Sequence, residues 1–135
     1  GDSRADNDRA WLRHPNGATA MSRVWLAPPR GDVRNLQRVF ETLGAEVTSA
    51  RVYAPEGVQA TVATVGNGEV LVLPQANQVI DERPIVGATF EVRNLDTLRR
   101  WLTSMGIAFR AGGARDASVI VAPETTQGLW LEFRE

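Results

Sequence analysis

Hydrophobic residues alternate with polar ones in short segments of the chain and recur every three or four residues in two longer segments. Alternation is typical of half-buried strands, and the longer spacing is typical of amphipathic helices. The predicted helices are 32–43 and 95–105, and each ends before a glycine, Gly44 or Gly106. The predicted strands are 21–28, 46–54, 59–65, 69–75, 87–92, 107–111, 117–123 and 129–135.

Local signals set several of these boundaries. The double proline at Pro28 and Pro29 ends the first strand, because proline does not donate to a strand ladder. Asp32 is the predicted N-cap of the first helix. The turn Gly66-Asn67-Gly68 predicts a tight hairpin between the two strands that it joins.

The order strand, helix and three strands therefore occurs twice, which indicates an internal duplication. Aligning the glycines that end the two helices pairs Phe40 with Leu102 and Leu36 with Leu98. We predict an α+β fold in which two tandem βαβββ units form a curved mixed sheet, with the helices outside and a trough inside. Residues 1–20 are predicted to be a mobile lead-in, and residues 21–135 are predicted to be one domain. That domain consists of the units 21–75 and 85–135, which are joined by the linker 76–84.

The alternation also predicts which side chains face the trough. In the first strand of each unit, every second side chain packs against the apolar side of the helix. The alternate side chains therefore point to the other face of the sheet. The predicted lining is Arg23, Trp25, Glu91, Trp130 and Glu132. Flat aromatic walls with one cation and one carboxylate suit a planar, polar-edged small molecule. The alternative is an ion pair between Arg23 and Glu132 that joins the two sheets.

Composition excludes several kinds of chemistry. The chain has 15 basic and 16 acidic residues, a formal net charge of −1 and no cysteine. Every basic residue is arginine, so a lysine Schiff base is excluded, as is a cysteine nucleophile. A near-neutral charge argues against nucleic acid as a partner, and no apolar run is long enough for a membrane helix. We expect a cytoplasmic protein, and the absence of lysine is typical of GC-rich bacterial genomes.

Three segments belong to the duplicated order: VRNLQRVFETLGAEV, GATFEVRNLDTLRRWLTSMGI and APETTQGLWLEFRE. With these segments the duplication resembles the vicinal oxygen chelate superfamily, which holds glyoxalases, methylmalonyl-CoA epimerases, extradiol dioxygenases and the fosfomycin- and bleomycin-resistance proteins. The resemblance covers 21–135, and its most specific part is the closing P-x-x-x-x-G-x-x-L-E-F. The segment HPNGA that begins at His14 also looks like the lead into the C-terminal half of larger glyoxalase-like proteins.

The enzymes of this superfamily hold a divalent metal in the trough, so the resemblance implies a metal site at the matching positions of this chain. Its ligands are a His or Glu on the first strand of each unit and a Glu on the last strand. Those positions fall at Arg23, at about Val72, at about Gly87 and at Glu132. Arginine, valine and glycine side chains are not metal ligands, so we expect no cofactor. If a metal is bound, Glu132 is the one candidate ligand at these positions and His14 is a candidate outside them.

Three hypotheses follow. The first is a metal-free small-molecule-binding protein of the bleomycin-resistance kind, which predicts a roomy trough. The second is a metal-dependent lyase, isomerase or dioxygenase with Glu132, Glu91 and His14 as ligands, in which Glu132 is the candidate catalytic residue. The third is a structural module of a larger glyoxalase-like protein, whose trough is filled by Trp25, Trp130 and Arg23. We favour the first, and we expect a homodimer because two chains can exchange units in this fold.

Overall fold

The computed structural model describes residues 18–135 of the chain. Strand β1 (Ala18–Leu26) begins inside the segment predicted as a lead-in, before the predicted start at Met21. The candidate metal ligand His14 lies outside the described residues, and its role stays a prediction.

The elements occur as two βαβββ units. The first unit contains β1, the short helix η1 (Arg30–Asp32), α2 (Val33–Thr42), β2 (Glu46–Tyr53), β3 (Gly57–Val65) and β4 (Gly68–Val72). A connection with η2 (Gln75–Asn77) leads to the second unit. That unit contains β5 (Ile85–Val92), α3 (Leu95–Ser104), β6 (Arg110–Gly112), η3 (Ala114–Asp116), β7 (Ser118–Val121), α4 (Pro123–Thr126) and β8 (Trp130–Arg134).

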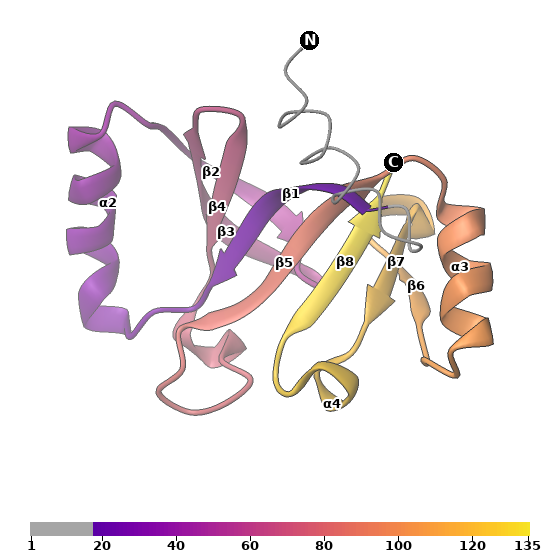
Figure 1. Ribbon diagram of the computed structural model, residues 1–135. Coiled ribbons are helices and arrows are strands. Elements are labelled where there is room, and N and C mark those ends of the chain that lie inside the picture. Colours follow the sequence, from indigo (N-terminus) through magenta and orange to yellow (C-terminus); the bar gives the residue numbers. More distant parts are fainter. Residues whose placement is uncertain (1–17) are drawn as a thin grey trace, which may run out of the picture.

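All the strands form one mixed sheet in the order β2-β3-β4-β1-β5-β8-β7-β6. The first strands of the two units, β1 and β5, are antiparallel neighbours at the centre. Each is also parallel to the last strand of its own unit, β4 or β8. The sheet curls, and α2 and α3 lie at its two outer flanks (Figure 1). The predicted fold class is confirmed.

The two helices begin differently. The side chain of Asn94 accepts a hydrogen bond of 2.9 Å from the backbone N–H of Thr97 and so caps α3. Asp32 occupies the corresponding position before α2 but makes no capping hydrogen bond, because it already belongs to the preceding η1 turn. Asp32 therefore stands at the predicted N-cap position, but its side chain forms no hydrogen bond that caps the helix. Gly44 and Gly106 adopt positive φ after the two helices, as C-terminal glycines commonly do.

Each helix covers a hydrophobic cluster on the outer face of the sheet. Phe40 of α2 packs with Ala63 and Val72, and Leu98 and Leu102 of α3 belong to a larger cluster with Val92, Leu95, Val119, Val121 and Phe133. Not every apolar residue of this helical segment is buried: Val39 in α2 is 52% exposed, and Leu43, which follows α2, is 66% exposed. A third cluster lies on the inner, concave face of the first unit.

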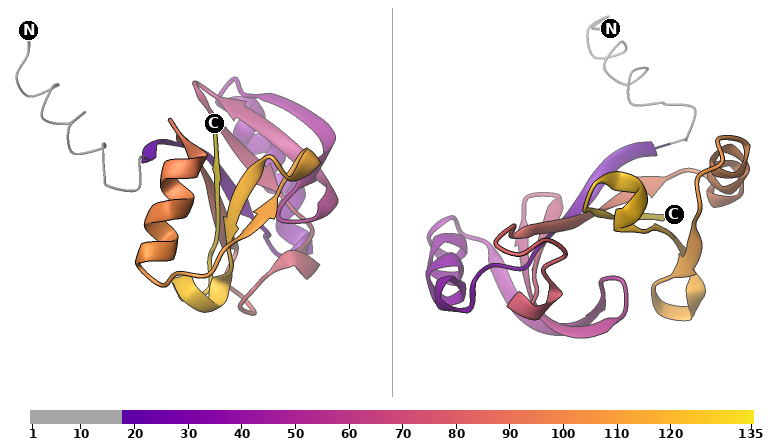
Figure 2. Two further views of the ribbon diagram at one scale, coloured as in Figure 1. Left: turned by 90° about the vertical axis from the view of Figure 1, so that its right-hand side faces the viewer. Right: turned by 90° about the horizontal axis from the view of Figure 1, so that it is seen from below.

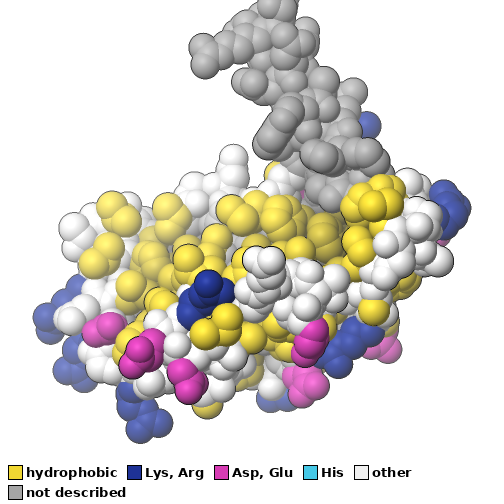
Figure 3. All heavy atoms as spheres, turned by 60° about the horizontal axis from the view of Figure 1, so that its bottom comes forward, with side chains coloured by type: hydrophobic (Ala, Val, Ile, Leu, Met, Phe, Trp, Pro, Cys, Tyr) yellow, Lys and Arg dark blue, Asp and Glu magenta, His cyan; other side chains and the backbone are white. Residues whose placement is uncertain are grey.

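Hydrophobic side chains also reach the molecular surface. Figure 3 shows them gathered across the middle of one face, with a basic side chain among them and other charged side chains along the lower edge. No helix among residues 18–135 has the length and apolar character needed to cross a bilayer. The predicted homodimer and the predicted cytoplasmic location stay predictions.

Candidate functional site

Two rows of side chains cross the concave floor of the sheet. Strand pairing places Leu71, Trp25, Gly87 and Trp130 side by side on β4, β1, β5 and β8, and we name this set the apolar row. The next residues on the same face are Glu69, Arg23, Thr89 and Glu132, which we name the polar row. The four strands thus bring together residues that are far apart in the chain.

Gly87 determines the position of Trp25 in the apolar row. A Cβ atom at Gly87 would lie 2.7 Å from Cε3 of the Trp25 ring and 2.7 Å from the carbonyl oxygen of Trp130. Because glycine leaves this space free, the indole lies across Gly87 and is completely buried. The sequence predicts the Trp25 ring on the wall of the trough, but in the structure the ring is buried within the floor.

A chain of hydrogen bonds runs from Trp25 through the polar row. The indole Nε1 of Trp25 donates to Oγ1 of Thr89 at 2.9 Å. Oγ1 of Thr89 donates in turn to Oε1 of Glu132 at 2.9 Å, and Oγ of Ser118 donates to Oε2 at 2.9 Å. An indole N–H only donates, so the direction of the first two bonds is determined. Thr89, Ser118 and Glu132 are all buried, and these bonds hold the Glu132 carboxylate in one orientation.

Two ion pairs flank this network. Nε of Arg23 lies 2.6 Å from Oε1 of Glu69, and Nε of Arg134 lies 3.0 Å from Oε1 of Glu91. Arg23 pairs with Glu69 because the parallel register of β1 and β4 sets the two residues opposite each other. The alternative ion pair between Arg23 and Glu132 is therefore wrong.

A cavity of about 370 Å³ opens above the polar row. Its walls come from β1, β2, β7 and β8 and from the segment between β6 and β7. Figure 2 (right) shows the β2–β3 hairpin and that segment on opposite sides of the curled sheet. The lining residues are Arg23, Arg51, Val52, Tyr53, Gly113, Ala114, Ala117, Ser118, Glu132 and Arg134. A water molecule needs roughly 30 Å³, so the prediction of a filled trough that holds no more than a few waters is wrong.

The cavity continues into a groove. Tyr53 and Gly113 also line a neighbouring cavity of about 270 Å³. That cavity shares Pro55, Glu56, Gly57 and Arg110 with a third one of about 430 Å³, where Trp130 forms part of the wall. The guanidinium carbon of Arg110 lies 5.3 Å from the centroid of the Trp130 ring, in cation–π geometry.

Gly113 brings the backbone close to Glu132. Its φ is +73°, and a Cβ atom there would lie 3.0 Å from Oγ of Ser118 and 3.5 Å from Oε2 of Glu132. Arg115 and Asp116, two and three residues further on, also have positive φ. Left-handed backbone outside glycine is uncommon and often marks functional segments, so this part of the cavity rim has unusual local geometry.

The residues in the trough do not fit a divalent metal. Pairing of β4 with β1 places Leu71 on the concave face, whereas Val72 packs beneath α2, so the position predicted at about Val72 is Leu71. Arg23 is a cation, Leu71 is apolar, and the Trp25 ring occupies the space beside Gly87. Within residues 18–135, no group of three His, Cys, Asp or Glu side chains is close enough to hold a metal ion.

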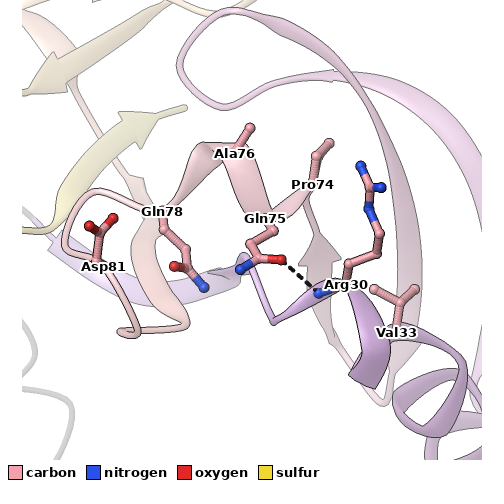
Figure 4. A pocket seen from close by; sticks show the side chains of 7 residues that line it. All are labelled: Arg30, Val33, Pro74, Gln75, Ala76, Gln78 and Asp81. Carbon is pink, nitrogen blue, oxygen red and sulfur yellow. Dashed lines mark hydrogen bonds between the residues drawn. The ribbon is translucent and has the colours of Figure 1, made fainter.

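A larger pocket of about 580 Å³ lies away from the polar row, between η1 and η2 (Figure 4). Two of its polar side chains form hydrogen bonds with the backbone. Oε1 of Gln75 accepts a hydrogen bond from the N–H of Arg30, and Nε2 of Gln78 donates to the carbonyl of Ala27. Arg30 and Asp81 lie toward opposite ends of the pocket. No set of functional groups converges there, so we place the candidate site in the trough.

The structure therefore brings Arg23 and Glu132 into one cavity, with Trp130 on the connected groove and Glu91 behind Arg134. Sequence reasoning missed Arg51, Ser118 and the role of Thr89. Ile120 of β7 pairs with Glu132 of β8, and Ser118 lies two residues before Ile120, on the same face of the strand. Alternation would have placed Ser118 beside Glu132 if the register of β7 against β8 had been known. No local signal identifies Arg51.

No protein-family model and no curated protein matches the sequence. Solved structures do match. Methylmalonyl-CoA epimerase from Mycobacterium tuberculosis aligns with a TM-score of 0.60 and 17% identity over 87% of each chain. A hypothetical protein from Bacillus halodurans C-125 aligns with a TM-score of 0.59 and 18% identity over 84% of this chain and 91% of its own.

A catechol 2,3-dioxygenase aligns with a TM-score of 0.50 and 16% identity, over 84% of this chain and 39% of that longer one. At these identities the similarity establishes the fold alone. The chain has the vicinal oxygen chelate fold, as the sequence resemblance predicts.

Proposed function

We propose that the protein binds a small organic molecule in the cavity above the polar row, without a metal ion, as a member of the glyoxalase and bleomycin-resistance type of binding protein. The observation that carries this proposal is a single cavity of about 370 Å³ that combines a buried, hydrogen-bonded carboxylate with arginine side chains. Ligand sites typically are concave and hold a few well-placed polar groups of this kind.

The donor set supports binding without metal. Three of the four positions that carry metal ligands in the enzymes of this fold hold Arg23, Leu71 and Gly87 here. Both oxygens of the fourth residue, Glu132, already accept hydrogen bonds from hydroxyl groups. The hypothesis of a lyase, isomerase or dioxygenase would need further ligands in the trough.

The connected groove supports a ligand with a flat part. The ring of Tyr53 is partly exposed where the first two cavities meet, and Trp130 lies in the wall of the third. Aromatic side chains in such positions stack on planar groups. The polar edge of the ligand then faces Glu132, and its flat part follows the groove from Tyr53 toward Trp130.

A thermal-shift screen tests this proposal. Wild-type protein in excess EDTA is incubated with a library of small acids, bases, zwitterions and neutral aromatic molecules, and the unfolding temperature is recorded. Ala117→Trp fills the cavity, and Ala76→Trp places the same ring in the pocket between η1 and η2 as a matched control. We expect compounds that stabilise the wild type and Ala76→Trp but not Ala117→Trp.

Two results would contradict the proposal. One is a library in which no compound depends on the open cavity. The other is stabilisation that appears only after a divalent metal is added, which would favour the metal-dependent hypothesis and make His14 a residue to mutate.

A further inference from the structure

The charged groups around the cavity are of two kinds. Some belong to ion pairs, and others are single, which means that no opposite charge of residues 18–135 lies within ion-pair distance. Arg23 is paired with Glu69, and Arg134 is paired with Glu91. Within residues 18–135, Arg51 has no carboxylate and Glu132 has no cation within ion-pair distance. Both line the same cavity. Among the described residues, the cavity lining therefore includes one cation, Arg51, and one carboxylate, Glu132, that have no counterion within ion-pair distance.

Glu132 has the capacity to accept further hydrogen bonds. An ionised carboxylate has about four lone-pair sites. One hydroxyl, from Thr89 or Ser118, occupies a site on each oxygen, so each oxygen retains a second. A carboxylate that is only 4% exposed and has no cation of residues 18–135 within ion-pair distance gains strongly from a donor that enters the cavity with a positive charge.

Arg51 is suited to bind an anion at the cavity mouth. It is exposed on β2, and its guanidinium lies over Gly57, where a Cβ atom would come within 2.4 Å of Nη2. Glycine at position 57 thus leaves room for the arginine beside the groove. A guanidinium fork binds a carboxylate through two parallel hydrogen bonds, which gives it both strength and direction.

We propose that the ligand is a zwitterion of the α-amino acid class, with its ammonium group on Glu132 and its carboxylate on Arg51. The inference rests on the proposed function and specifies its ligand. The apolar side chain of the amino acid enters the groove past Tyr53, toward Ile120 and Trp130. A zwitterion pairs both single charges at once and adds no net charge to the site.

Calorimetric titration of the metal-free wild type with four related probes tests this inference. L-Phenylalanine carries both charges, phenyllactate replaces the ammonium with a hydroxyl, 3-phenylpropanoate lacks the ammonium, and phenethylamine lacks the carboxylate. We expect L-phenylalanine to bind at least about tenfold more tightly than 3-phenylpropanoate and phenethylamine, with phenyllactate between them.

Two variants assign the two charges. Glu132→Gln keeps hydrogen-bonding groups for Thr89 and Ser118, and we expect it to abolish the preference for L-phenylalanine over 3-phenylpropanoate. Arg51→Gln is expected to abolish the preference over phenethylamine. Arg38→Gln removes an exposed arginine from α2, outside the cavity, and serves as the control. The unfolding temperature of each variant shows that it is folded.

The possible failures are distinguishable. If another compound in the screen binds in the cavity and L-phenylalanine does not, or if either singly charged probe binds as tightly as L-phenylalanine, the zwitterion is refuted and the proposed function stands. An unchanged preference in Glu132→Gln also refutes it. If no compound of any charge depends on the open cavity, both the inference and the proposed function fail.

Discussion

The concave faces of the two units share one backbone plan but differ in chemistry. In the first unit the parallel strands place Trp25 beside Leu71, and in the second they place Thr89 beside Glu132. On the opposite, helix-covered face the two units remain alike, with Val72 beneath α2 and Phe133 beneath α3. The helix side of each strand maintains the fold, whereas the trough side is free to diverge.

This difference gives the two units separate tasks in the site. The first unit supplies a buried apolar floor and the cations Arg23 and Arg51, while the second supplies the carboxylate with its hydroxyl partners. The second unit also contributes Arg134, which is paired with Glu91, so neither unit alone supplies both of the single charges, Arg51 and Glu132. Substitutions that move the chemistry of one unit into the other test how far this division reaches.

The largest effect is expected when the carboxylate of the second unit is introduced into the first. Leu71→Glu places a charge in a completely buried position among apolar side chains. A buried charge without a partner costs about 3–5 kcal/mol. Urea unfolding at pH 7 measures the loss.

Leu71→Met conserves volume and should cost less than about 1.5 kcal/mol, which separates charge from packing. A stable Leu71→Glu protein with bound divalent metal would contradict our account of the first unit. Such a result would mean that its concave face tolerates a ligand set after all.

The fold could be predicted because its signals are local. Helix spacing, the Gly66-Asn67-Gly68 turn and strand alternation all act over a few residues, and α2, α3 and the β3–β4 hairpin appear where they are predicted. Strand β6 is shorter than predicted because Ile107 and Phe109 pack against the α3 cluster before the ladder begins.

The site was predicted less completely because it depends on the register between strands of different units. Alternation assigns Arg23, Trp25 and Glu132 to one face of the sheet. Alternation does not show that Trp25 lies opposite a glycine, so that its ring can lie across that glycine. It also does not show that Glu69 lies beside Arg23. These contacts join residues more than 40 positions apart in sequence.

The second effect concerns the boundary between the units, at Gly87. Gly87→Ala adds a Cβ atom that collides with the Trp25 ring and with a backbone carbonyl, neither of which has space to move. We expect a loss of about 3 kcal/mol in the free energy of unfolding. Gly31→Ala, where no atom lies within 4 Å of the added carbon, is the matched control and should change stability by less than about 1 kcal/mol.

A third substitution breaks the connection between the two units in the polar row. Thr89→Val keeps the shape of the side chain but removes the hydroxyl that joins Trp25 to Glu132, so a buried indole N–H loses its acceptor. The expected cost is about 2 kcal/mol, with a shift of the Trp25 contribution to the emission toward shorter wavelength, which is read from the difference between variant and wild-type spectra because the chain has four tryptophans. Ser118→Ala removes a hydrogen bond from Glu132 alone and should leave that emission unchanged. Equal spectra for the two variants would contradict the network.

The smallest effect on stability is expected for the ion pair of the first unit. The side chains of Arg23 and Glu69 are 20% and 30% exposed, so solvent screens their attraction and Glu69→Gln should cost less than about 1 kcal/mol. The substitution has a larger effect on binding, because it leaves Arg23 as a second single cation facing the cavity. The affinity for 3-phenylpropanoate should then rise several-fold while that for phenethylamine does not, which calorimetry measures. A rise for both probes would mean that Glu69 acts by closing the cavity and not by neutralising Arg23.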